Sequence, residues 1–218
     1  MCFEGGIVMS DLTKLADTVF RGDFGSAGQI TKELIDSGVE PLTIINQGLI
    51  AGMDIVAPKF KAGEMFVPEV MMAARAMAVG MEVVKPLIQD ADIPSKGTVL
   101  IGTVAGDLHD IGKNLVIMIL ESGGFKVVDL GVDVSVEKFV AAAKQYNPQV
   151  IGMSALLTTT MTAMKDTIDA LMEAGLRQSL KVIVGGAPLS QEFAGQIGAD
   201  GYAADAMAAK ELCEKLAV

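Results

Sequence analysis

The sequence predicts two folded parts in tandem: a four-helix bundle, then a doubly wound, five-stranded parallel sheet with helices on both faces. In the first part, apolar residues recur at helical spacing, and Gly, Pro and Asp residues stand at the breaks. In the second, five short Val- and Ile-rich runs alternate with helical segments, which is typical of parallel strands buried on both faces. A chain of 218 residues is long enough for two small domains.

The first part is expected to form an antiparallel bundle over residues 10–90, because its four helices are joined by short connections. Ser10 is placed to cap a helix that reaches about Arg21, and residues 1–9 are expected to be an extension before the folded part. The other helices are expected at 24–37, ending at Gly38; at 42–60, with Pro41 in the first turn; and at 68–88, bent or ended by Pro86.

A linker, residues 91–97, is expected to precede the sheet domain, residues 98–218. The predicted strands are 98–103, 125–130, 149–153, 181–185 and 199–202. In a doubly wound sheet, ligands bind outside the carboxyl ends of the strands, where the strand order reverses. The polar or small residues expected together at that edge are Asp107, His109, Ser154 and Gly185.

Composition excludes several classes of protein. The chain is 51% hydrophobic and 5% aromatic, as in globular proteins, and no apolar run reaches the roughly 18 residues that span a membrane. Its N-terminus lacks the basic start of a secretory signal. A net charge of −10, from 17 basic and 27 acidic residues, argues against binding to nucleic acid. Cys2 and Cys213 form no disulfide or zinc pattern, so a reducing cytoplasm is expected.

The segment Asp107–Gly112 follows the first predicted strand and contains His109, the only histidine of the chain. One histidine is too few for a bare zinc or iron ion, which takes three or four protein ligands. It is enough for a metal whose other positions are filled by a macrocycle. Asp107 is placed to hold the ring of His109 in one tautomer. Alternatively, Asp107 could cap the next helix, although Asp110 fits that role better.

Three motifs resemble the corrinoid-binding signature of cobalamin domains of the methionine synthase type. They are Asp107-x-His109-x-x-Gly112, Ser154-x-Leu156 and Gly185-Gly186. The first and second are separated by 41 residues (113–153), and the second and third by 28 residues (157–184). All three stand at distances similar to those of that family, so the resemblance does not depend on the short Asp-x-His pattern alone.

The resemblance implies a Rossmann-like or flavodoxin-like domain that binds cobalamin or a related corrinoid, which cycles between methylcobalt(III) and cobalt(I). It implies that His109 is the lower axial ligand of cobalt, in place of the cofactor's own dimethylbenzimidazole. Asp107 would accept the other ring N–H, and Thr160 would complete a His–Asp–hydroxyl relay. Thr160 stands where a serine is expected, and it could instead only cap the following helix.

Further contacts with the cofactor follow from the same resemblance. Ser154 and Thr158 would line the pocket for the displaced nucleotide tail, and Gly185-Gly186 would let a flat ring approach the backbone. Each could instead serve only its local turn or helix. The full set of expected cofactor contacts is Gly106, Asp107, Leu108, His109, Asp110, Ile111, Gly112, Ser154, Leu156, Thr158, Gly185, Gly186, Tyr202, Ala204, Phe66 and Met71.

The helical part resembles the cap bundle that precedes such cobalamin domains, in the stretch from Gly63 to Glu69. A cap would cover the upper face of the corrin, with Phe66 and Met71 as candidates to shield it, although each could be an ordinary core residue. With both parts included, the resemblance is closest to small corrinoid proteins of anaerobic methyltransferase systems for methylamines, methanol, glycine betaine or methoxylated aromatics.

That family implies a non-catalytic subunit that carries a methyl group on cobalt. Its expected partners are a substrate-specific methyltransferase, a second methyltransferase with a folate or thiol acceptor, and a reductive activase. Two other functional hypotheses stay open. One is a cobalamin sensor, which usually carries a basic DNA-binding part. The other is the cobalamin subunit of an adenosylcobalamin-dependent mutase, against which the small size and the cap stretch argue.

Overall fold

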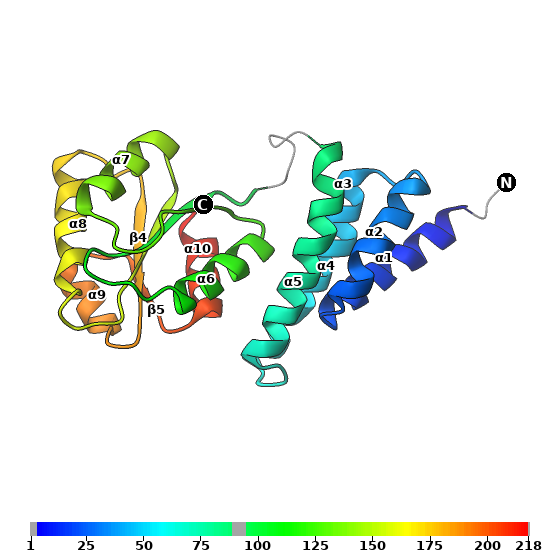
Figure 1. Ribbon diagram of the computed structural model, residues 1–218, viewed down its shortest axis with the longest axis horizontal. Helices are drawn as coiled ribbons and strands as arrows, with labels where there is room; N and C mark the ends of the chain where they lie inside the picture. The colour runs from blue at the N-terminus through cyan, green and yellow to red at the C-terminus, as the bar shows by residue number, and fades with distance from the viewer. Residues whose placement is uncertain (1–3, 89–94, 218) are drawn as a thin grey trace. The chain divides into compact units, whose positions relative to one another are not determined.

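The computed structural model describes residues 4–88 and 95–217 of the chain. These residues form two compact units, one helical and the other a sheet flanked by helices (Figure 1). The helical unit lies within the first 94 residues, and the second comprises residues 95–121 and 125–218. Of the expected linker, residues 91–94 lie outside the described residues.

The helical unit contains α1 (Glu4–Phe20), α2 (Phe24–Asp36), α3 (Pro41–Thr43), α4 (Ala51–Lys61) and α5 (Val67–Val84). A π-helical turn, Ile44–Ile50, joins α3 to α4 without a break in helical conformation, so these segments together form the expected third helix. Helix α1 packs against α2 and α4, and α5 packs against the same two helices, as in a four-helix bundle. The side chain of Asp23 caps α2.

The predicted start of the first helix is wrong. Helix α1 begins at Glu4, so Ser10 lies inside it and does not cap its N-terminus. The apolar residues Ile7 and Val8 extend the helical pattern beyond Ser10, and a serine is only a weak obstacle to helix propagation. Residues 4–9 of the expected extension are therefore helical, and residues 1–3 lie outside the described residues.

The second unit contains β1 (Thr98–Thr103), β2 (Lys126–Asp129), β3 (Val150–Ser154), β4 (Lys181–Gly185) and β5 (Gly201–Ala203). All pairs are parallel, and the order is β2-β1-β3-β4-β5, so the strand order reverses between β1 and β3. The expected strands are confirmed, with ends shifted by one or two residues. The connecting helices are α6 (Ile111–Ser122), α7 (Val136–Tyr146), α8 (Thr162–Glu173), α9 (Gln191–Ile197) and α10 (Ala206–Leu216).

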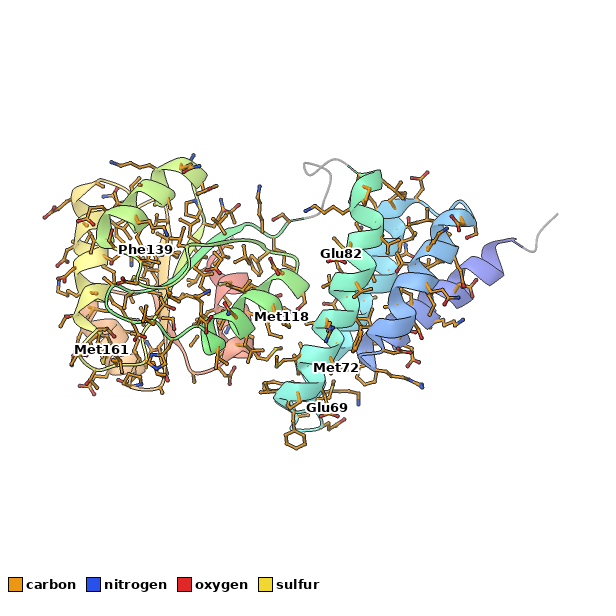
Figure 2. All side chains as sticks on the ribbon, in the orientation of Figure 1. Glu69, Met72, Glu82, Met118, Phe139 and Met161 are labelled. Carbon is orange, nitrogen blue, oxygen red and sulfur yellow. The ribbon has the colours of Figure 1, made fainter. Side chains whose placement is uncertain are left out.

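Helices cover both faces of the sheet (Figure 1). On the face of α7, α8 and α9, Leu100, Ile151 and Val182 belong to a cluster with Phe139, which is fully buried (Figure 2). On the face of α6 and α10, the neighbouring residues Val99 and Ile183 belong to a second, smaller cluster. The alternation follows from the two-residue period of a strand. No helix among the described residues is long and apolar enough to cross a membrane.

Candidate functional site

The register of the sheet brings the predicted motifs to one edge. Thr103, at the end of β1, pairs with Ser154, which pairs with Gly185, which pairs with Ala203. The loops that carry His109, Leu156 and Gly186 leave the sheet directly after these residues. The carboxyl ends of β1 and β3 also lie where the strand order reverses, which is where doubly wound sheets bind ligands.

His109 and Asp107 form a hydrogen-bonded pair in the loop after β1. The Nδ1 atom of His109 lies 2.7 Å from Oδ1 of Asp107, and the same oxygen accepts the backbone N–H of His109 at 3.1 Å. The carboxylate is buried, whereas the imidazole side chain is 52% exposed. Since an ionised carboxylate only accepts hydrogen bonds, the ring proton lies on Nδ1 and leaves the lone pair of Nε2 free for a metal.

The second oxygen of Asp107 joins the β1 loop to the β3 loop. Oδ2 accepts the N–H groups of Leu156 at 2.7 Å and Leu157 at 3.2 Å, and the hydroxyl of Thr160 lies 3.0 Å away. Burial acts to raise the pKa of Asp107. The hydrogen bonds from Leu156, from the ring and N–H of His109, and from Thr160 outweigh it and hold this pKa well below its ordinary range. Asp107 is therefore a fixed negative charge.

The expected contact between Thr160 and Asp107 is present. The hydroxyl of Thr160 also lies 2.9 Å from the carbonyl oxygen of Leu157, so its single proton has two acceptors within reach. The extra methyl of this threonine lies close to Gly106. A Cβ built on Gly106 would stand 3.4 Å from that methyl carbon, and Gly106 has a φ of +81°, a conformation that favours glycine.

Two residues to which the sequence analysis gave no role, Thr103 and Asp133, contact this loop, and a third, Lys113, lies next to it in α6. Thr103 donates its hydroxyl to the carbonyl oxygen of His109 at 2.8 Å. Asp133 accepts the N–H of Gly106 at 2.7 Å. Lys113 is buried and places Nζ 2.8 Å from both carboxylate oxygens of Asp129 and from the amide oxygen of the neighbouring Asn114. No motif signalled these contacts, because each joins segments that only the tertiary fold brings together.

A cavity of about 510 Å³ opens beside His109, within the second unit. Its walls come from the sheet on one side and from α6 and α10 on the other. Its interior is apolar, with Val99, Val116, Leu120 and Ile183 among the lining residues. Cavities of this volume, with an apolar wall and few polar groups at the mouth, are typical of cofactor sites. The expected contact residues that line it are Leu108, His109, Asp110, Ile111, Gly112, Ser154, Leu156, Gly185, Gly186 and Ala204.

The Gly185-Gly186 pair has a structural reason beyond the expected one. Gly186 has a φ of +139°, and a Cβ there would lie 1.8 Å from the carbonyl oxygen of Ala155. Only glycine therefore lets the β4 loop pass so close to the β3 loop. Gly185 lines the cavity, and its own Cβ would lie 3.1 Å from the carbonyl oxygen of Ala203.

Six of the expected contacts do not line the cavity: Gly106 and Asp107 belong to the loop described above, and the other four lie elsewhere. Tyr202 lies in β5, and it packs against the cluster on the α7 to α9 face, because successive strand residues face opposite sides of the sheet. Thr158 is exposed in the turn after Leu156. Phe66, at the start of α5, and Met71, within it, are exposed residues of the helical unit. A contact of these two with a cofactor stays a prediction.

The donor set fits a metal held in a macrocycle. Among residues 4–88 and 95–217, no group of three His, Cys, Asp or Glu side chains could hold a metal ion. His109 instead offers one oriented nitrogen at the mouth of a cavity large enough for an aromatic base. These residues fit a corrinoid, whose ring supplies four nitrogens to the metal.

Comparison with known proteins agrees with this geometry. Residues 97–210 and residues 12–85 match two families that share the description B12 binding domain. A corrinoid protein of Desulfitobacterium hafniense is 42% identical over 213 residues, 96% of this chain and 99% of the relative. Trimethylamine corrinoid protein 1 of Methanosarcina acetivorans is 44% identical over 193 residues, 88% of this chain and 89% of the relative.

Solved structures show the same relationship. A chain of the methanol:cobalamin methyltransferase complex of Methanosarcina barkeri superposes with a TM-score of 0.87 and 34% identity, over 95% of this chain and 80% of that one. A cobalamin-binding protein of Desulfitobacterium hafniense reaches 0.74 with 31% identity, over 94% and 98% of the two chains. The fold, the site and these relatives lead to one conclusion: the chain belongs to the family of B12-binding corrinoid proteins.

Proposed function

We propose that this chain carries a methyl group on the cobalt of a bound corrinoid, with His109 as the lower axial ligand. The observation that carries the proposal is the His109–Asp107 pair. A buried carboxylate fixes Nδ1 at 2.7 Å and so leaves Nε2 as the coordinating nitrogen, beside a cavity for the displaced tail. When bound, the corrinoid supplies a cobalt centre that accepts a methyl cation in its cobalt(I) state and donates it from methylcobalt(III).

The residues of the site set the donor strength of His109. Asp107 keeps its negative charge, since its hydrogen bonds hold its pKa well below the ordinary range. A carboxylate that accepts the Nδ1 proton makes Nε2 a stronger donor and prevents rotation of the ring. Thr160 supports the carboxylate from its other side at 3.0 Å.

The cavity would hold the tail base away from cobalt. Small residues, among them Gly152, Ala203 and Ala209, leave the space between the sheet and the helices empty of side chains. Ser154 lines this cavity, and we expect its hydroxyl to bond a ring nitrogen of the tail. The apolar wall removes water from the base, and burial of an aromatic base contributes favourably to binding.

The partners follow from the relatives. A structural neighbour is part of a methanol:cobalamin methyltransferase complex, and the relatives in Methanosarcina are named for trimethylamine and dimethylamine. We therefore expect a substrate-specific methyltransferase to methylate the bound cofactor, and a second methyltransferase to pass the methyl group to a folate or thiol. A reductive activase would restore cobalt(I) after oxidation, and the expected place of action is the cytoplasm.

The test is the electron paramagnetic resonance spectrum of the protein loaded with cobalamin and poised as cobalt(II). Because His109 is the only histidine, a chain made without a histidine tag and labelled with nitrogen-15 histidine carries the label at one residue. We expect the hyperfine splitting from the axial nitrogen to change with the label and to disappear in His109→Ala. Cobalamin uptake with a splitting that ignores the label would refute axial ligation, and a folded protein that takes up no cobalamin would refute the corrinoid function.

A further inference from the structure

The loop that carries His109 belongs to no helix or strand between Gly106 and His109. Its position depends on contacts from neighbouring segments. Asp107 provides one set, which ties its side chain to the β3 loop. Those bonds hold the carboxylate, but the backbone on each side of it is held by different residues, Thr103 and Asp133.

Thr103 holds the backbone of His109 itself. It is the last residue of β1 and fully buried, and its hydroxyl donates to the carbonyl oxygen of His109 at 2.8 Å. Its own backbone is fixed on both sides: the N–H donates to Gly131 at 3.0 Å, and the carbonyl accepts from Val134 at 2.9 Å. The hydroxyl therefore connects His109 to a residue whose own backbone is held by two hydrogen bonds.

Asp133 holds the backbone on the other side of Asp107. Its carboxylate accepts the N–H of Gly106 at 2.7 Å, and its own N–H donates to the carbonyl oxygen of Asp107 at 3.0 Å. The residue adopts a φ of +50°, which is uncommon outside glycine but tolerated by Asp and Asn. This one residue thus holds two peptide groups of the loop, the one before Gly106 and the one after Asp107.

We propose that Thr103 and Asp133 are positioning residues that fix the loop backbone around Asp107 and His109, and so fix the direction in which Nε2 faces the metal. The proposal rests on the proposed axial ligation, because orientation of Nε2 matters only if it coordinates. Neither residue touches the imidazole, so both act through the peptide groups. A loop free to shift would keep the His109–Asp107 pair while the ring swung out of line with cobalt.

The experiment uses two matched pairs of variants in the full chain. Thr103→Val keeps the shape and the strand preference but removes the hydroxyl, whereas Thr103→Ser keeps the hydroxyl. Asp133→Gly keeps access to positive φ but removes the carboxylate, whereas Asp133→Asn keeps an oxygen acceptor in a residue that tolerates that conformation. Asp133 is exposed, so its variants remain informative if Thr103→Val does not fold.

Two measurements distinguish a failure of the positioning role of Thr103 and Asp133 from a failure of the proposed axial ligation by His109. The first is amide hydrogen exchange at Gly106 and His109 in the protein without corrinoid, measured by nitrogen-15 nuclear magnetic resonance. The second is the ratio of histidine-coordinated to uncoordinated cobalt(II), from the resonance spectrum with labelled His109. One hydrogen bond of ordinary strength corresponds to roughly a fivefold change in such an equilibrium. We expect that change in both readouts for Thr103→Val and Asp133→Gly, and values close to the parent for Thr103→Ser and Asp133→Asn.

The proposal would be overturned if folded Thr103→Val and Asp133→Gly had the same amide exchange rates and the same coordination ratio as the parent protein. Faster exchange with an unchanged ratio would also overturn it, because the two residues would then stabilise the loop without positioning the ligand. Absence of a label-dependent splitting in the parent protein would refute the axial ligation instead. In that case the exchange rates alone still decide whether Thr103 and Asp133 hold the loop.

Discussion

The cavity beside His109 leads to a prediction that uses the tail of the cofactor as a probe. Gly152 lies in the middle of β3 and lines this cavity, on the same side of the sheet as Val150. A Cβ at this position would stand 3.4 Å from Cγ1 of Ile101, an ordinary contact, so the strand accepts a Cβ there. In Gly152→Val, the added methyl groups would occupy space that we assign to the tail base.

The expected magnitude follows from the cost of overpacking. Extra methyl groups in a filled apolar site cost about 1–3 kcal/mol, which corresponds to roughly a five- to 150-fold loss of affinity. The loss should apply to cobalamin, which has a tail, and not to cobinamide, which has none. Isothermal titration with both ligands measures this difference. Gly195→Val is the matched control, because Gly195 is exposed on α9 and an added Cβ there meets nothing within 4 Å.

Equal affinity of the parent and a folded Gly152→Val for cobalamin would refute the assignment of the cavity to the tail. An equal loss for cobalamin and cobinamide would also refute it, because the substitution would then act on the corrin ring or on the fold. A lower affinity for cobalamin alone would support the assignment of the cavity to the tail, and with it the displacement of the cofactor's own base from cobalt.

Three further outcomes are expected. His109→Ala should still bind cobalamin, because the cavity is intact, while the label-dependent splitting disappears; a folded variant without cobalamin uptake would contradict this. Asp107→Asn should lower the free energy of unfolding by roughly 1–3 kcal/mol, since an amide cannot accept all the hydrogen bonds that reach the carboxylate. Because the folded pKa of Asp107 lies below the unfolded value of about 3.9, its stabilisation is fully present above that value and is lost as the pH falls through the folded pKa. The difference between parent and variant in urea denaturation should therefore shrink as the pH falls below about 4. Burial, with a smaller contribution from Glu214, raises the pKa of Cys213 to about 12, so in a Cys2→Ser variant thiol reagents at pH 8 should react only after denaturation.

Local patterns predicted most elements of the fold, and the exceptions have physical reasons. Pro86 ends α5 as expected, because it has no N–H for the helix, and the chain continues as a 3₁₀ turn, Lys85–Leu87. Ser10 was misjudged, since a residue that caps helices well is also tolerated inside them. Tyr202 was expected to contact the cofactor, but its side chain lies on the α7 to α9 face of the sheet and the cavity lies on the other face; which face a strand residue occupies depends on the register.

By itself, the sequence determined the order of the elements, the edge of the sheet that carries the site, and the three spaced motifs that include His109. These are properties of local periodicity and of short peptides at strand ends, and both can be read along one dimension. Only the tertiary structure decided which groups surround Asp107, that Thr103 and Asp133 hold the loop, and that Gly186 is required beside Ala155. Each of these contacts joins segments that folding brings together, and their distances depend on strand register and side-chain packing, which no single segment encodes.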